Sequence, residues 1–308
     1  MLVTGGAGFL GSHLCEALLS QGHDVVAIDN LLTGKIENIE HLQNSNSRLQ
    51  FQQVDICEPF DLPDPVDYIF HLAIPAGPTD SVDYPFETLR TGSFGTINVL
   101  TLAIKHKAKF LLASASEVYG DAQIHPQTED YWGFCNPVGV RSTYTEAKRL
   151  SEVATMAYRR YHGVDTRIAR LSSIYGPRMR TDDGRLIPNL MIEALRNHPL
   201  TVHGDGTQTR SFIYVSDAVS GMLKLAWSNE HSPVNLGWPH EVTILECAQQ
   251  VIAITGSKSE LSFGPLAEDD PKRRCSDITK ARTLLNWEPQ VDLPAGLKLS
   301  LPYFRDAA

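Results

Sequence analysis

The sequence lacks the cysteine patterns that cross-link small domains by disulfides or bind a structural metal ion. Its five cysteines in 308 residues are odd in number and include no C-x-x-C pair: Cys15, Cys57, Cys135, Cys247 and Cys275. Such thiols argue against a disulfide framework and favour a reducing compartment, so we expect a cytoplasmic protein. The eleven histidines include no i, i+4 pair, and we expect no metal site.

Long apolar runs and an excess of positive charge are also absent. No run approaches the roughly 20 apolar residues that cross a bilayer. The chain opens on a strand pattern and glycines rather than on a signal peptide, so we expect no membrane partner. With 27 basic against 36 acidic residues the net charge is −9, which argues against nucleic acid as a partner. A few local arginines are still enough to bind a small anion.

Strand and helix patterns alternate over the first half of the chain. Strands are predicted at 2–4, 24–29, 49–54, 68–72, 110–113 and 166–171, and helices at 11–20, 95–107 and 142–162. This alternation predicts an α/β protein with a parallel, doubly wound sheet. Such sheets bind their ligands at the carboxyl ends of the strands.

The alternation loosens after residue 172, where short strands, prolines and isolated helices at 187–196 and 244–255 follow. We interpret this part as a smaller C-terminal lobe that binds the substrate. The expected sheet domain comprises 1–172 and about 212–235, and the lobe comprises 173–211 and 236–308. No internal repeat or low-complexity linker separates them, so we expect the two parts to pack together.

A glycine-rich turn joins the first strand to the first helix. Gly5, Gly8 and Gly11 have a G-x-x-G-x-x-G spacing, which lets the backbone approach a pyrophosphate at a helix N-terminus. Asp29 ends the second strand 18 residues after Gly11. A carboxylate there binds the ribose hydroxyls of NAD and repels the 2′-phosphate of NADP. The sequence therefore predicts a Rossmann fold that binds NAD.

Neighbouring strand ends supply the rest of the expected cofactor site. Asp55 and Ile56 follow the third strand, where they would meet the adenine, although Asp55 is equally suited to capping its own loop. The other expected cofactor contacts are Phe9, Leu10, Asn30, Leu72, Ala73 and Ser114.

A tyrosine and a lysine lie four residues apart on the helix at 142–162. Tyr144 and Lys148 therefore share one face of it. An ammonium favours a neighbouring phenolate, so we expect Lys148 to lower the pKa of Tyr144 from its usual value of about 10. Tyr144 would then take a proton from a sugar hydroxyl, and Lys148 would hold the nicotinamide ribose. The pair is informative because it follows an NAD-binding turn and the serine-rich strand end at 114–116.

These residues resemble those of the extended short-chain dehydrogenase/reductases, and more closely those of the UDP-glucuronate decarboxylases. The resemblance covers almost the whole chain. GxxGxxG and YxxxK mark only the superfamily. The narrower stretches are SEVYGD, HPQTEDYWGFCNP, YTEAKR, YGPRM, TVHGDGTQTRSFIYVSD and DDPKRRCSDITKA.

The resemblance implies further site residues. Glu117, with Ser116, would lie beside the sugar and help to position the ring and handle protons. Arg274 would lie near the sugar and the diphosphate, and Arg210 and Asn189 would bind the substrate phosphates. The implied substrate site also includes Pro75, Tyr144, Ser173, Arg178 and Val202. Two arginines in one lobe suit a diphosphate on chemical grounds as well, although each could be a surface charge and Glu117 a salt-bridge partner.

The sequence departs from the family at several positions near the chemistry. Ala115 replaces a Thr or Ser whose hydroxyl bridges the tyrosine and the sugar. Ser114 or Ser116 would have to substitute for it, although neither side chain points the same way from a strand end. Gly92 and Ser173 replace asparagines, and Asp80 and Ser81 replace an asparagine and a tyrosine. Together these changes suggest a reshaped sugar pocket.

The expected function is the NAD-dependent decarboxylation of UDP-glucuronate to UDP-xylose through a 4-keto intermediate. One alternative is a UDP-hexuronate 4-epimerase or a nucleotide-sugar 4,6-dehydratase. Another is a weakly active protein that binds NAD and a nucleotide sugar, which Ala115 would explain. Tyr144 and Lys148 argue against the last alternative, and Glu117 with Arg274 favours the decarboxylase.

We also expect a homodimer formed by the helices at 95–107 and 142–162. The apolar spacing of Val99, Leu102 and Ala103 suggests such a contact, unless these residues simply cover the sheet. Tyr131 and Trp132 are expected to pack under the lid of the substrate lobe.

Overall fold

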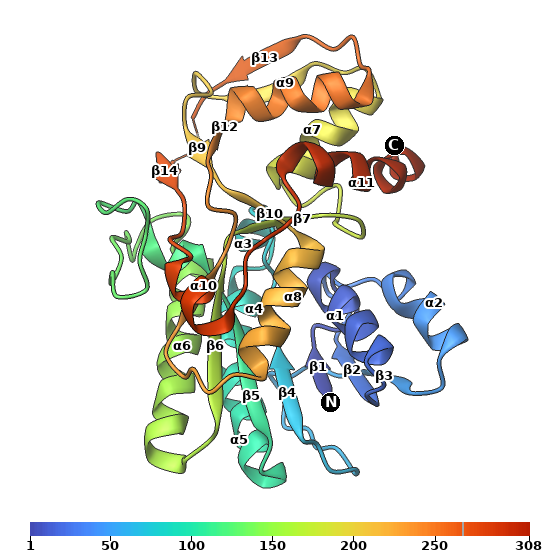
Figure 1. Cartoon of the computed structure of the whole chain (residues 1–308), viewed down its shortest axis with the longest axis vertical. Coiled ribbons are helices and arrows are strands. Elements are labelled where there is room, and N and C mark those ends of the chain that lie inside the picture. The colour runs from blue at the N-terminus through green and yellow to red at the C-terminus, as the bar shows by residue number, and fades with distance from the viewer. Residues whose placement is uncertain (267) are drawn as a thin grey trace.

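A seven-stranded parallel sheet forms the centre of the protein in the computed structural model, which describes residues 1–266 and 268–308 (Figure 1). The strands are β1 (Leu2–Thr4), β2 (Val25–Asp29), β3 (Leu49–Gln53), β4 (Tyr68–His71), β5 (Lys109–Ala115), β6 (Thr166–Leu171) and β11 (Val234–Leu236). Their spatial order is β11-β6-β5-β4-β1-β2-β3, and every pairing is parallel. The predicted doubly wound sheet is therefore confirmed, and its winding direction reverses between β1 and β4, where ligands bind such sheets.

Helices cover both faces of the sheet. One face is covered by α1 (Phe9–Ser20), α2 (Glu37–Ser45) and α8 (Val215–Ala226), and the other by α5 (Thr96–His106) and α6 (Ser142–His162). The bounds predicted for α6 and β6 match the structure. The first helix begins at Phe9, two residues earlier than predicted, because Gly8 already serves as its extended N-cap.

The second half of the chain adds small sheets and more helices. Its strands form three groups: β7 (Ser173–Tyr175) with β10 (Phe212–Tyr214); β12 (Val242–Thr243), β9 (Thr209–Arg210) and β14 (Arg273–Arg274); and β8 (Leu200–His203) with β13 (Leu261–Gly264). Figure 1 shows α7 (Leu186–Leu195), α9 (Ile244–Thr255) and α11 (Leu293–Ala307) gathered at one end of the molecule. The helix α10 (Thr279–Leu285) contacts α8 and β11 instead.

Local sequence explains where two of these helices begin. Thr243 and Glu246 form a capping box at the start of α9, and the Asp292 side chain caps α11. The chain returns to the main sheet at β11, which pairs with β6. The exact boundaries of the sheet domain and the substrate lobe stay a prediction.

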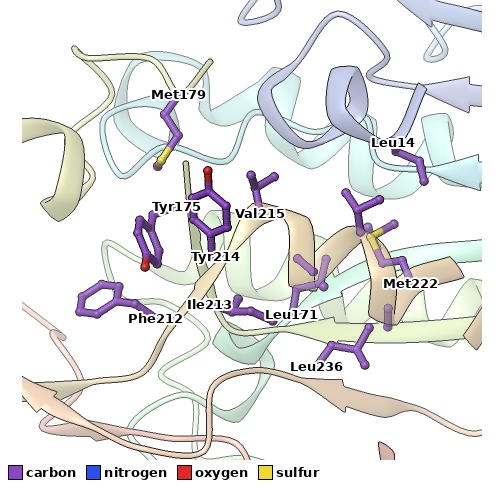
Figure 2. Close-up of a cluster of buried hydrophobic side chains, with 14 of the residues drawn as sticks. Leu14, Leu171, Tyr175, Met179, Phe212, Ile213, Tyr214, Val215, Met222 and Leu236 are labelled. Atoms are coloured by element: carbon purple, nitrogen blue, oxygen red, sulfur yellow. The ribbon is translucent and has the colours of Figure 1, made fainter. Parts of the chain in front are cut away.

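One hydrophobic core joins the two halves of the chain. Figure 2 shows side chains of α1, α8 and the main sheet packed beside those of the β7–β10 pair, and the labelled residues include Leu14, Leu171, Tyr175, Met179, Phe212, Tyr214 and Met222. All of them are buried. Close packing of this kind resists small displacements. It therefore fixes the β7–β10 pair relative to the main sheet.

The face of α5 that suggested a dimer contact is buried in the protein itself. Val99, Leu102 and Ala103 pack against the sheet, so the prediction that these three residues meet a second copy is wrong. Trp132 is also placed differently from the prediction, because 89% of its surface is exposed, whereas the Tyr131 ring stacks on Tyr119.

Two short helices and a π-helical turn lead into α5. They are α3 (Asp80–Asp83), α4 (Pro85–Arg90) and the turn Thr91–Gly95. The turn packs on α6. A Cβ atom at Gly92 would lie 2.6 Å from the Cβ of Ala147 and 2.8 Å from its carbonyl oxygen. The departure at Gly92 is thus explained by helix packing, because an asparagine there would displace the helix that carries Tyr144 and Lys148.

None of the helices among the described residues is long and apolar enough to cross a membrane.

Candidate active site

A cavity of about 880 Å³ runs from the glycine-rich turn to the second half of the chain. Its walls include the carboxyl ends of the central strands, the start of α6, and residues of α7, β9 and β14. Nearly all residues that the sequence nominates for the cofactor and substrate sites line this cavity. Ser116 and Val202 do not.

The glycine-rich turn forms one end of the cavity. Gly11 packs so tightly on the turn that an added Cβ would lie 2.0 Å from the carbonyl oxygen of Gly5. The helix α1 begins at Phe9 without a side-chain cap, and Gly8, Phe9, Leu10 and Gly11 all line the cavity. Uncapped amide groups at a helix N-terminus are suited to a phosphate, so the turn fits the pyrophosphate of NAD.

The carboxylate of Asp29 lies at the end of β2 on the same cavity. It accepts hydrogen bonds from the backbone N–H groups of Ala7 (3.1 Å) and Leu31 (2.9 Å). Burial raises the pKa of Asp29, and the backbone donors partly offset this. One carboxylate oxygen is therefore held by the glycine-rich turn and the other by the backbone just after β2, which fixes the carboxylate as a ribose-binding group requires.

The other expected cofactor residues also line the cavity: Asn30, Asp55, Ile56, Leu72, Ala73 and Ser114. Asp55 in addition accepts a hydrogen bond from the backbone N–H of Cys57 (2.9 Å). It therefore caps its own loop, which was the alternative interpretation of this residue.

Lys148 is buried beneath the cavity. Its ammonium donates to the carbonyl oxygen of Ala113 (2.6 Å) and lies 5.8 Å from the centroid of the Tyr144 ring. Burial lowers the pKa of Lys148 to about 8, while Glu117 and then Glu152 oppose the change. The charge of Lys148 thus depends on nearby carboxylates.

The phenol of Tyr144 does not have the lowered pKa that the sequence suggested. Burial raises its pKa and Glu117 raises it further, whereas Arg185 and Arg274 act in the opposite direction. The expectation that Lys148 alone lowers the pKa of Tyr144 is therefore wrong for the chain by itself, because the desolvation of a phenolate outweighs the cationic neighbours.

Glu117 and Arg274 form an ion pair on the cavity wall. Glu117 lies on the 3-10 turn Ser116–Tyr119 after β5, and its Oε1 accepts from Nη1 of Arg274 at 2.5 Å. Burial opposes ionisation of Glu117, but Arg274, with smaller help from Arg141 and Arg210, holds its pKa below the usual value. The Nε of Arg274 is buried and has no hydrogen-bond partner among residues 1–266 and 268–308, so this guanidinium keeps a free donor.

Arg210 lies beside Arg274 because β9 and β14 pair in parallel with these two residues in register. Burial lowers the pKa of Arg210 to about 10, and Arg274 adds to the effect while Asp270 opposes it. Two adjacent buried guanidinium groups attract an anion. Asp270 already contacts one of them, through Nη2 of Arg210 at 2.7 Å.

Sequence reasoning missed several charged residues of the cavity wall, among them Arg141, Arg185 and Asp270. Arg141 donates to Asp270 (2.5 Å), which therefore bridges Arg141 and Arg210. The only signal for Arg141 and Arg185 was their position, three residues before Tyr144 and four before Asn189.

No serine compensates for Ala115 in the way that the sequence suggested. Ala115 itself lines the cavity, but the Ser114 hydroxyl donates to Glu152 (2.6 Å). The Ser116 hydroxyl is fully buried without a partner. Among these three positions, none presents a free hydroxyl to the cavity.

The remaining substrate residues are placed as follows. Pro75, Ser173, Asn189 and Arg178 line the cavity, with Arg178 bound to Glu16 of α1 (2.6 Å). Val202 is fully buried in the core, whereas Thr201 and His203 line the cavity. The assignment of the Val202 side chain needs correction, because successive residues of a strand point to opposite faces.

The departure at Asp80 is tied to a local ion pair. Its carboxylate accepts from Nη1 of Arg180 (2.7 Å) and from the backbone N–H of Gly77 (2.8 Å). The Asp80 side chain is nearly fully buried, so it holds the neighbouring loops together, and Ser81 lies outside the cavity lining.

Comparison with curated proteins identifies relatives that match almost the whole chain. UDP-glucuronic acid decarboxylase 1 of Danio rerio is 48% identical over 304 residues, which cover 99% of this chain and 72% of the relative. UDP-glucuronic acid decarboxylase 3 of Arabidopsis thaliana is 45% identical over 306 residues, or 99% of this chain and 89% of the relative.

Solved structures match the fold over the same extent. The UDP-glucose 4-epimerase of Thermotoga maritima, in a structure with UDP-glucose, has a TM-score of 0.90 at 30% identity and covers 99% of this chain and 98% of its own. The UDP-glucuronic acid 4-epimerase of Bacillus cereus, in complex with UDP-glucuronic acid and NAD, has a TM-score of 0.89 at 31% identity and covers 100% and 99%.

The sequence pattern of one family spans the main sheet, the glycine-rich turn and the Tyr144–Lys148 pair, with a match over residues 1–237. Together with relatives nearly half identical over the whole chain, this match shows that the protein belongs to the NAD dependent epimerase/dehydratase family.

Proposed function

We propose that this protein decarboxylates UDP-glucuronate to UDP-xylose through a 4-keto intermediate, with NAD as its cofactor. The observation that carries the proposal is the grouping of Tyr144, Lys148 and the Glu117–Arg274 ion pair on one cavity. Relatives called UDP-glucuronic acid decarboxylases support it at 45–49% identity. NAD would bind to the sheet domain, which comprises residues 1–172 and about 212–235. The nucleotide sugar would bind to the smaller lobe, which comprises residues 173–211 and 236–308.

Tyr144 acts first, as the base that takes the proton of the C4 hydroxyl. The glycine-rich turn and Asp29 would hold NAD, which would supply a hydride acceptor for C4 and a positive ring that favours the Tyr144 phenolate. Lys148 supplies a second positive charge under the site, with its ammonium fixed by the carbonyl oxygen of Ala113. These charges offset the burial that raises the pKa of Tyr144 in the chain alone.

Oxidation at C4 is what permits loss of the carboxylate. The new ketone is β to the carboxylate on C5, so the C5–C6 bond can break with its electron pair delocalised into an enolate. Carbon dioxide leaves, a proton adds to C5, and hydride return at C4 gives the pentose. Glu117 and Arg274 lie on the wall where charge must be managed during these steps, and Arg274 has an unused buried N–H for an anionic group.

The diphosphate is expected at the paired arginines of β9 and β14. Arg210 and Arg274 lie side by side in register, and Asn189 lines the same cavity. In this arrangement substrate phosphate oxygens would replace Asp270 as the partner of Arg210. A diphosphate carries more negative charge than a single carboxylate and so binds the guanidinium N–H groups more strongly.

A 4-epimerase is the second candidate, since a UDP-glucuronic acid 4-epimerase shares the fold at 31% identity. Both reactions begin with the same oxidation at C4, in which Tyr144 removes the hydroxyl proton and the hydride would pass to NAD. They differ in whether carbon dioxide is released, so product analysis separates them directly.

The proposed activity is tested by incubating the protein with NAD and UDP-glucuronate and analysing products by mass and NMR. We expect carbon dioxide and UDP-xylose. Tyr144→Phe is expected to abolish oxidation because it removes the base. Arg274→Ala is expected to impair decarboxylation, with substrate affinity measured separately by calorimetry. UDP-galacturonate without carbon dioxide would replace the decarboxylase by the epimerase.

NAD is expected to bind at least about tenfold more tightly than NADP, equivalent to roughly 1.4 kcal/mol. The reason is that the Asp29 carboxylate, fixed by Ala7 and Leu31, repels a 2′-phosphate. Titration calorimetry with both cofactors measures this preference, and Asp29→Asn should narrow it. Tighter binding of NADP to the unmodified protein would contradict the assignment.

Ala115→Thr tests whether the missing hydroxyl limits the reaction. If Ala115 is a handicap, the new hydroxyl should speed C4 oxidation by about tenfold, for roughly 1.4 kcal/mol of transition-state stabilisation. If Ala115 instead makes room for a different sugar, the same change should lower the native activity. Single-turnover NADH formation measures the step, and Ala115→Val, which adds similar bulk without a hydroxyl, is the control.

We also propose a homodimer, through other residues of the helices first considered, and a cytoplasmic location, which five unpaired thiols support. Exposed apolar side chains on and beside α4, α5 and α6 form the candidate surface: Phe86, Leu89, Phe94, Ile97, Leu150 and Val153. An exposed apolar patch of this kind is typical of an interface.

Light scattering at micromolar concentration is expected to give the mass of a dimer. Val153→Asp should shift it towards the monomer, because a charge would be buried at the contact. Leu284→Asp, at an equally apolar and exposed position on α10, should leave the mass unchanged. A monomer for the unmodified protein would refute the dimer.

A further inference from the structure

A third residue continues the Tyr144–Lys148 face of α6. Glu152 follows Lys148 by four residues, as Lys148 follows Tyr144. The Glu152 carboxylate accepts two hydrogen bonds from Arg170 of β6, from Nε at 2.9 Å and from Nη2 at 2.8 Å. Both side chains are only 12% exposed. The geometry is the forked, two-point pairing that fixes direction as well as distance.

This ion pair holds the segment that carries Glu117 at both of its ends. Glu152 accepts a hydrogen bond from the Ser114 hydroxyl (2.6 Å) at the end of β5. Arg170 donates through Nη1 to the Tyr119 hydroxyl (3.0 Å), and its guanidinium lies over the Tyr119 ring at 5.0 Å. Ser114 and Tyr119 flank Ala115, Ser116 and Glu117. The short segment is therefore fastened at both sides to α6 and β6.

We propose that Glu152 and Arg170 are positioning residues that set the Glu117 turn against the Tyr144–Lys148 helix, with the Glu152 carboxylate one helical turn from Lys148 on the same face. This inference rests on the proposed function, since it assigns roles to groups of the same site. It deepens that function by naming the element that sets the distance between the base and the Glu117–Arg274 pair.

Arg170 is tied to further elements that would transmit a disturbance. Its Nη1 also donates to the carbonyl oxygen of Glu129 (3.0 Å), and the Tyr119 hydroxyl donates to Asn235 of β11 (2.8 Å). A buried ion pair contributes little net stability compared with an apolar pair. What it adds here is a directional link between α6, β5, β6 and the turn after β5.

The charge of Lys148 gives this role a signature that simple structural support lacks. The groups that face Lys148 are Glu117 from the turn, Glu152 and Tyr144 from its own helix, and His71 from β4. His71 is neutral, because burial lowers its pKa to about 3. Removing the charge of Glu152 takes away one of the two carboxylates that oppose burial and leaves the Arg170 guanidinium unpaired, so we expect the pKa of Lys148 to fall. As the pH is raised, the ammonium then loses its proton at a lower pH than before, and any step that needs it is lost from that pH upwards.

The test uses Glu152→Gln in the full-length protein, with lysines labelled with ¹³C at Cε. The Lys148 signal, identified by its loss in Lys148→Arg, is titrated without substrate. We expect its midpoint to lie roughly half a pH unit or more below that of the unmodified protein. In the reaction we expect kcat for carbon dioxide release to fall about tenfold or more, KM to change less than about threefold, and the alkaline limb of the pH profile to move to lower pH.

Asp165→Asn is the matched control. Asp165 lies just before β6 and pairs with the buried Arg167 of that strand (2.5 Å). Ser114 lies opposite Arg170 in the other half of β6. The Asp165→Asn change should lower thermal stability without moving the Lys148 midpoint. If Glu152→Gln does not fold, the double variant Glu152→Gln/Arg170→Gln removes both charges and takes its place, with the same loss of kcat expected.

Two results would overturn the inference. One is an unchanged Lys148 midpoint in folded Glu152→Gln, and the other is a kcat within twofold of the unmodified protein. Failure of the unmodified protein to release carbon dioxide from UDP-glucuronate would refute the proposed function instead. The titration without substrate does not depend on that outcome.

Discussion

The site depends above all on keeping a lysine charged inside the protein. An ammonium loses its hydration when it is buried, and this cost lowers the pKa of Lys148 to about 8. Three features offset it: the carbonyl oxygen of Ala113 at 2.6 Å, the carboxylate of Glu117 and the carboxylate of Glu152. The same carboxylates require Arg274 and Arg170 as partners. Lys148 is therefore linked through two carboxylates, Glu117 and Glu152, to two further cations, Arg274 and Arg170.

The fold and the cofactor half of this arrangement could be predicted from the sequence because they depend on local patterns. Strand–helix alternation and a glycine triplet are read within short windows, and α6 and β6 were predicted with their observed bounds. Sequence spacing also placed Tyr144 and Lys148 on one helix face. It could not show how deeply they are buried, and burial reverses the expected direction of the Tyr144 pKa.

The substrate half was harder to predict because its side chains come from distant segments. Asp270 bridges Arg141 and Arg210 across sequence separations of 129 and 60 residues, and no local pattern signals such a contact. Val202 shows a related limit: the segment was predicted to line the site, but the strand turns that residue into the core and Thr201 and His203 outwards. Strand orientation cannot be inferred from a motif alone.

The structure also divides the departures from the family pattern into two kinds. Gly92 and Asp80 are accounted for by packing against Ala147 and by the ion pair with Arg180. They therefore need no change of substrate to explain them. Ala115 and Ser173 also line the cavity, as Asp80 does, but no packing contact or ion pair described above accounts for them. Any altered preference for a sugar is concentrated at these two positions.

The pairing of β9 with β14 is only two residues long on each strand, yet it places Arg274 beside Arg210. So short a ladder contributes few backbone hydrogen bonds, and the repulsion between the two guanidinium groups, which Glu117 and Asp270 offset in part, opposes it. A polyanionic ligand seated between the arginines would cancel that repulsion, so part of its binding energy becomes folding energy for this corner of the protein. The apparent stability of the molecule should thus depend on how much nucleotide sugar surrounds it, and a cell poor in that metabolite would hold a looser protein.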